Sequence, residues 1–452
     1  MTTNNLRPAS PMHDNRFPDR VKQYLPVIIF GLVLAVAAYI RFWAAPISTG
    51  PDVEQFFAFA KTIKMYGLDF YRYAEAQLDY FPMKGWGFFY PPIWILLLAF
   101  SLFLAPGSSM GGQMVASVWR VAVKAPIITA DLAIGVLLFW AVPGSKWKKL
   151  LFASLWLLHP TAWFESGVFG QFDAIAAVFL LASVIMLIKN KDMLAFFLAG
   201  LAVMTKQHTL AAIAMMVIVC ARTMKFSRLA VNCLIMCGVA VVLSVPFLVT
   251  GNFVAYVRAL VAPGSSPGYQ DPLCFSFSGL GALLSWFHDI FGWDTTKFIA
   301  AMIPLLLIAL VVTGILCYKR RITALQAALA GFLVFVALYY RINYQYLIIY
   351  IPLALLVAAH TRYKLERVLA LVIAMLPAAW MWITNIPWWF NDLPSGYAWV
   401  KPMLDRLGMP ERYLSDWTYV IMAGLIMVTS LAYVVLVFTK WQQPKELSTD
   451  IQ

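Results

Sequence analysis

Long apolar runs separated by short basic clusters dominate this 452-residue sequence. Hydrophobic residues make up 62% of the chain, and charged residues only 12%. An α-helix needs about 20 apolar residues to cross the hydrocarbon core of a bilayer, and many of the runs approach that length. Because lipid offers the backbone no hydrogen-bond partner, spanning segments must be helices or a closed barrel. The pattern excludes a soluble globular protein and predicts an all-α polytopic membrane protein.

The basic residues predict how the chain is oriented. The net charge of +13 is concentrated in the short segments between apolar runs, as cytoplasmic loops require under the positive-inside rule. We therefore attribute the charge to topology and expect no nucleic-acid partner. Residues 1–23 are polar and precede an apolar run with no small-residue cleavage site, which predicts a cytosolic tail before an uncleaved first span. The clusters are Arg20 to Lys22, Lys146 to Lys149, Lys189 to Lys191, Arg222 to Arg228, Lys319 to Arg321 and Arg362 to Arg367.

The apolar runs predict about twelve crossings with both termini inside. The run after Pro92 is short, and a crossing there would invert every later basic cluster. We therefore expect residues 91–119 to be re-entrant or interfacial, within a first external loop that extends over 46–125. Residues 24–250 would form a catalytic transmembrane module. Residues 251–452 would form a variable one with external loops at 250–297 and 387–418. The predicted crossings are 24–45, 126–142, 150–166, 174–188, 193–205, 208–221, 229–249, 298–318, 323–340, 345–359, 366–386 and 419–439.

The remaining polar residues fall at the external ends of these crossings. Asp52 and Glu54 follow the first span directly, in a position that is costly for carboxylates unless it is used. The other groups are Gly170-Gln171-Phe172-Asp173, Lys206-Gln207-His208 and Arg341-Ile342-Asn343-Tyr344-Gln345-Tyr346. A transporter would instead be expected to place ionisable groups near the midplane of repeat-related broken helices, and the sequence has no such repeat.

One carboxylate, several cations and many aromatic residues at a membrane surface suit the transfer of a sugar from a lipid phosphate. The carboxylate takes a proton from the acceptor hydroxyl as it attacks the anomeric carbon. Cations such as Lys206, His208 and Arg341 stabilise the departing phosphate. Aromatic side chains stack on sugar faces at the interface. The sequence has no glycine-rich phosphate loop, which disfavours a soluble nucleotide donor.

The order of the motifs resembles the membrane-embedded GT-C glycosyltransferases. It is most similar to the glucosyltransferases of the N-glycan precursor pathway that use a lipid-phosphate glucose donor, and the later Tyr344-Gln345-Tyr346-Leu347 is similar to an element of the GPI-anchor mannosyltransferases. The resemblance covers residues 25–215 well. The motifs, in order, are Pro51-Asp52-Val53-Glu54-Gln55, Tyr90-Pro91-Pro92, Arg120 with Asp131-Leu132, His159-Pro160, Gly170-Gln171-Phe172-Asp173 and Lys206-Gln207.

The resemblance implies a GT-C fold with Asp52 as the general base. It implies a hexose, glucose or mannose, carried by polyprenyl or dolichyl phosphate and transferred with inversion to a glycan or glycolipid acceptor on the external face. Where the family has Gly-His-Phe-Gln, this chain has Gly170-Gln171-Phe172-Asp173, so the identity of the sugar does not carry over. The substrate-binding residues expected beside Asp52 are Glu54, Tyr90, Arg120, Gln171, Asp173, Lys206, Gln207, His208, Arg341, Tyr344 and Gln345.

Structural explanations compete with several of these assignments. An acid in the first turn of an external helix, such as Asp52, can act only as a cap, and Asp173 is a fair N-cap for the next crossing. Lys206 can snorkel to the outer headgroups, and Arg341 can be an interfacial anchor. Glu54 lies about 200° around a helix from Asp52, so the two cannot face one substrate atom.

Arg120 and Lys124 lie on the side of the membrane where basic residues are disfavoured. For both we favour contact with an anionic lipid head. His159 precedes Pro160 within an apolar run, where a packing role is the more common one.

Two other functions remain open. A lipid-linked sugar transporter or flippase would bind the same ligands without breaking the glycosidic bond. A polysaccharide ligase or polymerase would use a diphosphate donor and need no carboxylate in the first external loop. We expect no cofactor, no metal site and no disulfide framework, since the five cysteines lie mostly in or beside apolar runs. The absence of Asn-x-Ser/Thr sequons favours a bacterial inner membrane over the endoplasmic reticulum.

Overall fold

The computed structural model describes residues 16–111, 114–261, 278–383, 392 and 417–439. Within these ranges the chain is a helical bundle with one short strand pair. Most of the predicted external loop 387–418, part of the loop 250–297 and much of the tail 1–23 lie outside the described residues.

The helices follow the apolar runs closely. The longer ones are α1 (Arg16–Ile47), α2 (Pro51–Tyr66), α3 (Pro92–Leu104), α4 (Ser117–Ala141), α5 (Lys146–Leu157), α7 (Asp173–Ile188), α8 (Asp192–Thr205), α9 (Leu210–Thr223), α10 (Phe226–Phe247), α13 (Gly279–Phe291), α14 (Thr296–Lys319), α15 (Ala324–Leu338), α16 (Leu347–His360), α17 (Lys364–Ile383) and α20 (Trp417–Phe438). The shorter elements are η1 (Gly67–Tyr73), α6 (Pro160–Trp163), η2 (Phe164–Phe169), η3 (Gln207–Thr209), η4 (Leu248–Asn252), α11 (Phe253–Val261), η5 (Tyr344–Tyr346), and strands β1 (Met110–Gly111) and β2 (Met114–Val115).

Five helices in the described ranges are long and apolar enough to cross a bilayer. They lie in α1, α4, α10, α14 and α20. The remaining apolar helices have 10–17 residues, so most of them are shorter than a straight crossing requires. The structure thus confirms an all-α fold with membrane-spanning helices, whereas the predicted number of twelve crossings is not established.

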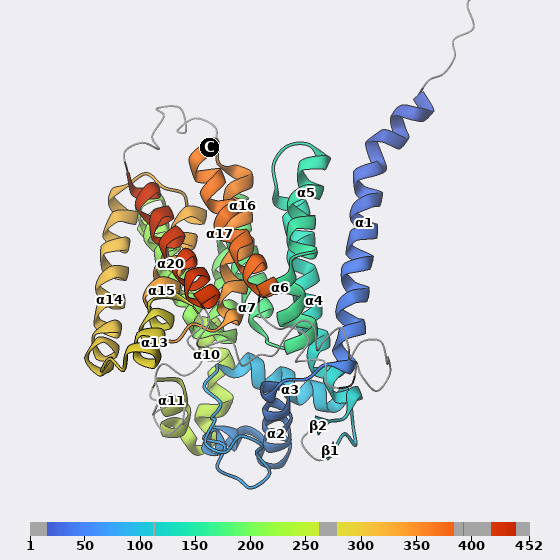
Figure 1. Cartoon of the computed structure of the whole chain (residues 1–452), viewed down its shortest axis with the longest axis vertical. Coiled ribbons are helices and arrows are strands. Elements are labelled where there is room, and N and C mark those ends of the chain that lie inside the picture. Colours follow the sequence, from blue (N-terminus) through green and yellow to red (C-terminus); the bar gives the residue numbers. More distant parts are fainter. Residues whose placement is uncertain (1–15, 112–113, 262–277, 384–391, 393–416, 440–452) are drawn as a thin grey trace, which may run out of the picture.

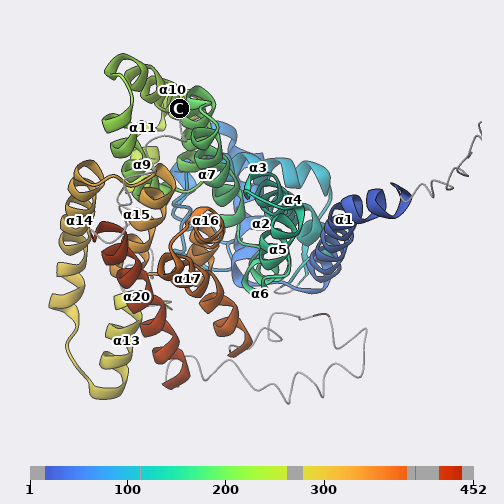
Figure 2. The same ribbon diagram turned by 90° about the horizontal axis from the view of Figure 1, so that it is seen from above.

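The bundle is built around α16. Every residue from Leu347 to Ala359 is buried, and α16 packs against α7, α15 and α17. The views of Figures 1 and 2 agree that α1 and α14 lie at opposite edges of the molecule. Helices α2 and α3 and the strand pair gather at the lower end of Figure 1, where α3 lies across the bundle. These elements belong to the predicted first external loop.

Two details differ from the sequence prediction. The run 150–166, predicted as one crossing, breaks after Leu157, and a new helical turn begins at Pro160. Proline has no N–H to continue a helix but is suited to a first helical turn. The chain then passes through the π-helical segment η2. The strand pair β1–β2, antiparallel and two residues long on each side, is a hairpin that the all-α prediction lacked.

The basic loops meet at the end of the bundle opposite α2. The Lys146 ammonium donates to the Gln23 carbonyl at 3.2 Å, and the Lys148 ammonium donates to the Ala359 carbonyl at 2.6 Å. Loops that are far apart in the sequence, but that all carry the basic clusters expected of cytoplasmic loops, therefore lie close together.

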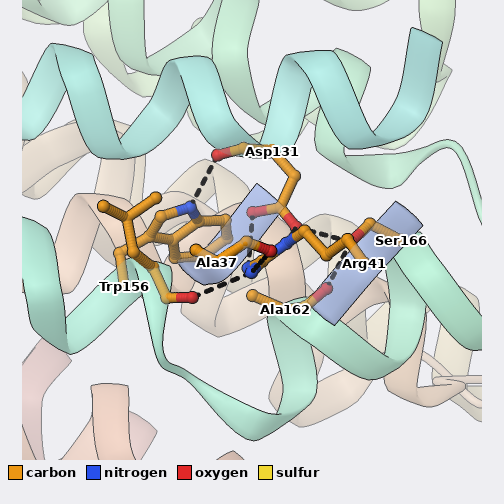
Figure 3. Close-up of polar contacts among 7 residues, drawn as sticks. Ala37, Arg41, Asp131, Trp156, Ala162 and Ser166 are labelled. Atoms are coloured by element: carbon orange, nitrogen blue, oxygen red, sulfur yellow. Dashed lines mark hydrogen bonds and ion pairs between the residues drawn. The ribbon is translucent and has the colours of Figure 1, made fainter. Parts of the chain in front are cut away.

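A buried ion pair holds α1 against α4. The Arg41 guanidinium donates through Nε to Asp131 Oδ2 at 2.6 Å, and both side chains are 1% exposed. Ser166 of η2 donates to the same carboxylate oxygen at 2.5 Å, and the Trp156 indole donates to the Asp131 carbonyl at 2.9 Å (Figure 3). Arg41 also donates to the Leu157 carbonyl at 2.9 Å. The cluster ties α1, α4, the end of α5 and η2 together.

We expect Asp131→Asn to destabilise the protein strongly. The substitution is isosteric and leaves the Arg41 charge buried without a counter-charge, which costs about 3–5 kcal/mol in comparable pairs. Thermal unfolding in detergent, followed by tryptophan fluorescence, measures the loss. Lys84→Ala breaks the exposed Lys84–Asp79 pair and should leave the unfolding temperature unchanged. Equal effects of the two variants would refute a structural role for the buried pair.

Candidate active site

Asp52 lies in the first turn of α2, beside the end of α1. Gly50 and Pro51 begin the helix, because proline at its first position needs no intrahelical donor bond. The Asp52 side chain is half-buried, and its Oδ2 accepts a hydrogen bond from the Gln171 side-chain amide. The structure therefore joins the first external loop to the motif 170–173, two segments 119 residues apart in the chain.

A left-handed turn places Gln171. Gly170 ends η2 with φ of +77°, a conformation that favours glycine. The Glu165 carbonyl accepts from both the Gly170 and the Gln171 amide at 2.9 Å. The Gln171 side chain is 1% exposed, so its amide is held in the protein interior facing Asp52.

The surroundings of Asp52 suit a base that works near neutral pH. Burial raises the pKa of its carboxyl group to about 6, against the lowering effects of the Lys206 charge, the Gln171 hydrogen bond and the Arg341 charge. The Asp173 charge adds to the increase. A carboxylate with such a pKa accepts a proton more readily than an exposed aspartate.

Asp173 and Lys206 form a closed ion pair next to this carboxylate. Lys206 Nζ lies 2.5 Å from Asp173 Oδ2, and the two side chains are 1% and 0% exposed. His208 Nε2 lies 3.7 Å from the other oxygen of Asp173. Lys206 terminates α8 and Asp173 begins α7. The pair thus joins two of the predicted motifs across the bundle, and most of the Lys206 charge is compensated locally.

Aromatic rings enclose the Lys206 ammonium. It lies 4.4 Å from the centroid of the Phe172 ring and 5.3 Å from that of Tyr90. Phe172 stacks on Trp94 with centroids 4.2 Å apart. The Gln207 side chain donates to the Phe89 carbonyl at 2.8 Å. Tyr90, Lys206 and Gln207 therefore belong to one assembly.

The motif 341–346, which follows α15, lies on another side of the same site. The Arg341 guanidinium lies over the Trp86 ring at 5.5 Å, and its charge acts on Asp52. Tyr344 and Gln345 are buried in the short helix η5. The next residue, Tyr346, lies 4.5 Å from His208 between ring centroids.

Glu54 and Arg120 lie away from this cluster. Glu54 accepts a hydrogen bond from the Thr49 hydroxyl at 2.6 Å, and burial raises the pKa of its carboxyl group. The charges that act on it are Arg120 and Lys124, not those around Asp52. Arg120 is 4% exposed and pairs with Asp392. Two of its nitrogens, Nε and Nη1, are buried without a hydrogen-bond partner among the described residues.

The position of Lys124 contradicts the prediction that this residue contacts an anionic lipid head. Its side chain is fully buried in protein, and its ammonium is occupied by protein oxygens of Ala45, Ser48 and Val168. It is therefore not available to a lipid head. His159 meets the expectation of a packing residue, since it is 1% exposed and its Nε2 lies 2.9 Å from the Ala374 carbonyl.

Two interior charges, Arg41 and Glu165, were missed by sequence reasoning. Glu165 of η2 is 2% exposed. It is close enough to Asp173, Lys206 and Asp52 for their charges to act on it. Arg41 lies within an apolar run and Glu165 lies at the end of one. An ionisable residue in such a position is by default a candidate for pairing or function, and this signal could have found Arg41 and Glu165. No group of three or more His, Cys, Asp or Glu side chains in the described part of the chain is arranged to hold a metal ion.

We expect Gly170→Ala to disrupt the turn that presents Gln171. A Cβ at this position would lie 2.8 Å from Val53 Cγ2 and 3.1 Å from Lys124 Cε, in addition to the left-handed strain of about 1–2 kcal/mol. Gly292→Ala carries the same strain at φ of +63° with nothing within 4 Å and serves as the matched control. Thermal unfolding should show a clearly larger loss for Gly170→Ala; equal losses would mean that the space around Gly170 does not matter.

Comparison with known proteins identifies the family. The family model for glycosyltransferase family 87 matches residues 88–339, more than half of the chain. The matched segment contains Gln171, Asp173 and Lys206 but ends before Arg341 and begins after Asp52. No curated protein matches the chain. With its apolar helices and the match to this family, the chain belongs to glycosyltransferase family 87 and is a membrane glycosyltransferase of the GT-C type.

Proposed function

We propose that this enzyme transfers a hexose, glucose or mannose, from a polyprenyl- or dolichyl-phosphate donor to a lipid-linked or other glycan acceptor. The observation that carries the proposal is the Asp52 carboxylate, which is bound by Gln171 and lies in the field of two cations at one end of the bundle. The resemblance to lipid-phosphate-dependent GT-C enzymes supplies the donor class.

The reaction would be a single displacement with inversion. The acceptor hydroxyl oxygen attacks the anomeric carbon while its proton passes to Asp52. The bond from that carbon to the phosphate oxygen breaks, and the electron pair stays on the phosphate. The carrier phosphodiester thereby becomes a monoester with one more negative charge. Catalysis then depends on aligning the acceptor and on stabilising this charge.

Arg341 is the best-placed cation for the leaving phosphate. Its guanidinium is partly exposed, over Trp86, and its charge acts on Asp52. Lys206 adds to the positive field, although Asp173 compensates much of its charge. Arg120 lies away from Asp52 and keeps two buried N–H groups without a partner among the described residues, as donors to a phosphate oxygen of the lipid-linked donor. Gln171, Gln207 and Gln345 each have a buried amide oxygen without a hydrogen-bond partner in the described ranges, which suits sugar hydroxyls as donors.

We further propose that the chain crosses the membrane about twelve times, with the Asp52 end outside. The shorter helices pack along longer ones, as α8 does on α10 and α9 on α14. Short helices can complete a crossing where their ends border a polar cavity. The basic clusters at the opposite end place that end in the cytoplasm. A bacterial inner membrane is the proposed location.

Asp52→Asn should slow transfer strongly while donor binding persists. The amide keeps the shape of the side chain but cannot accept the proton, so the rate should fall by about 10²–10⁴-fold. The assay uses purified protein in nanodiscs with labelled polyprenyl-phosphate glucose or mannose and a glycolipid extract as acceptor source.

The controls for this assay separate the alternative functions. Lys84→Ala, on the exposed surface, should keep the wild-type rate. Donor binding without transfer in the wild type would favour a transporter. Undiminished transfer by Asp52→Asn would show that this residue is not the base.

The rate of transfer should fall as the pH drops through about 6. The base acts in its deprotonated form, and burial raises the pKa of Asp52 to about 6. Below this pH the Asp52 carboxyl group is protonated and cannot act as the base, so the rate falls. Above this pH the rate is constant. The plot of log kcat/KM against pH should bend near this value, with a slope of about one on the acid side. A rate independent of pH down to about 4 would contradict the assignment.

A further inference from the structure

A fully buried lysine contacts the segment before the proposed base and the segment before Gln171. Lys124 of α4 is 0% exposed, and its Nζ is close to four protein oxygens. These are the Ser48 carbonyl at 2.7 Å, the Val168 carbonyl at 2.8 Å, the Ser48 hydroxyl at 2.9 Å and the Ala45 carbonyl at 3.2 Å. Three ammonium protons thus serve four acceptors.

These acceptors belong to the two segments that form the base assembly. Ala45 lies in the last turn of α1, and Ser48 follows the end of that helix, in the segment that leads to Asp52. Val168 lies in η2, three residues before Gln171. Lys124 is therefore a third element that connects the Asp52 segment to the Gln171 segment.

Unpaired helix-end carbonyls explain why a cation is found here. The last turn of a helix leaves carbonyls without intrahelical donors, and buried carbonyls need partners. The Ser48 hydroxyl donates to the Ala44 carbonyl at 2.6 Å, which leaves its lone pairs available to Lys124. The Arg41 and Asp131 pair joins the same two segments further along the chain from Asp52. Closer to Asp52 in the sequence, they are joined by Lys124 and by the Ser48 hydroxyl, which lies 3.3 Å from the Gly167 carbonyl and 3.2 Å from the Val168 carbonyl.

We propose that Lys124 is a positioning residue for catalysis, which holds the Asp52 turn and the Gln171 turn in the relative placement that keeps their side chains hydrogen-bonded. This inference rests on the proposed role of Asp52 as the base.

The charges around Asp52 make the proposal testable by titration. The charges that act on it are Lys206, Arg341 and Asp173, and Asp52 itself acts on Glu165. The charged groups facing Lys124 are Arg120 and Glu54. A change in the titration of Asp52 on replacing Lys124 therefore reports altered geometry. Because the Gln171 hydrogen bond lowers the pKa of Asp52, loss of that bond must move its titration to higher pH.

The test compares Lys124→Met and Ser48→Ala with the wild type. Misplacing a catalytic group by about 1 Å can cost 10²-fold in rate. For Lys124→Met we expect kcat to fall by about 10–10²-fold with little change in KM, and the acid limb of the pH profile to move to higher pH. Ser48→Ala removes one partner of Lys124 together with the direct contacts of the Ser48 hydroxyl to the Gly167 and Val168 carbonyls, and it should show the same shifts at smaller size. Lys124→Gln keeps a hydrogen-bond donor but removes the charge, and it decides the question if Lys124→Met does not fold. Thr129→Val, at an exposed position of α4, is the matched control.

A second readout is independent of transfer. Infrared difference spectra, with Asp52→Asn to assign the band, follow the protonation of the Asp52 carboxyl group directly. A titration at higher pH in Lys124→Met supports the proposal. An unchanged titration and an unchanged kcat in folded Lys124→Met or Lys124→Gln overturn it, even if the unfolding temperature falls. If the wild type transfers no sugar, the proposed function fails, and the infrared titration still decides whether Lys124 positions Asp52.

Discussion

The buried ion pair between Arg41 and Asp131 is the interaction on which the arrangement of the site depends. Two charges in a membrane-embedded bundle are tolerated only when each is paired and hydrogen-bonded. Ser166 of η2 donates to the Asp131 carboxylate, and Trp156 of α5 donates to the Asp131 backbone carbonyl (Figure 3). Helix α1 lies at one edge of the bundle (Figure 2). These contacts fix its position relative to η2. Asp52 follows directly from one of these elements and Gln171 from the other.

The site itself is a balance of charges in a mostly buried environment. Asp173 and Lys206 form a closed ion pair, whereas the pKa of Asp52 is set first by burial and then by the Lys206 charge, the Gln171 hydrogen bond and the Arg341 charge. This separation of roles explains how carboxylates close to one another can differ in chemistry. One is bound in an ion pair and the other keeps a raised pKa suited to accepting a proton. The family match includes the ion pair and Gln171 but not Asp52, so the proposed base rests on geometry and on the order of motifs.

The break in the predicted crossing 150–166 has a structural consequence. A continuous helix through Pro160 would carry Glu165 and the following residues along the bundle. Instead, the proline starts a new turn and η2 ends in the left-handed Gly170. The chain therefore turns between the end of α5 at Leu157 and the start of α7 at Asp173, and this turn presents Gln171 to Asp52. The irregular backbone of η2 therefore lies next to the proposed chemistry, where π-helical segments are often found.

The sequence by itself determined which segments are helices, because apolar runs of this length have no other way to satisfy the backbone in lipid. It also predicted that the polar motifs share one end of the bundle, since the basic clusters indicate how each apolar segment is oriented. It could not determine which polar side chains meet. The Asp52–Gln171 and Asp173–Lys206 contacts join residues 119 and 33 positions apart, and such contacts follow from helix packing, not from local pattern. Tertiary structure alone decided that Lys124 is enclosed by carbonyls, because three of its four acceptors are backbone atoms that no residue type reveals.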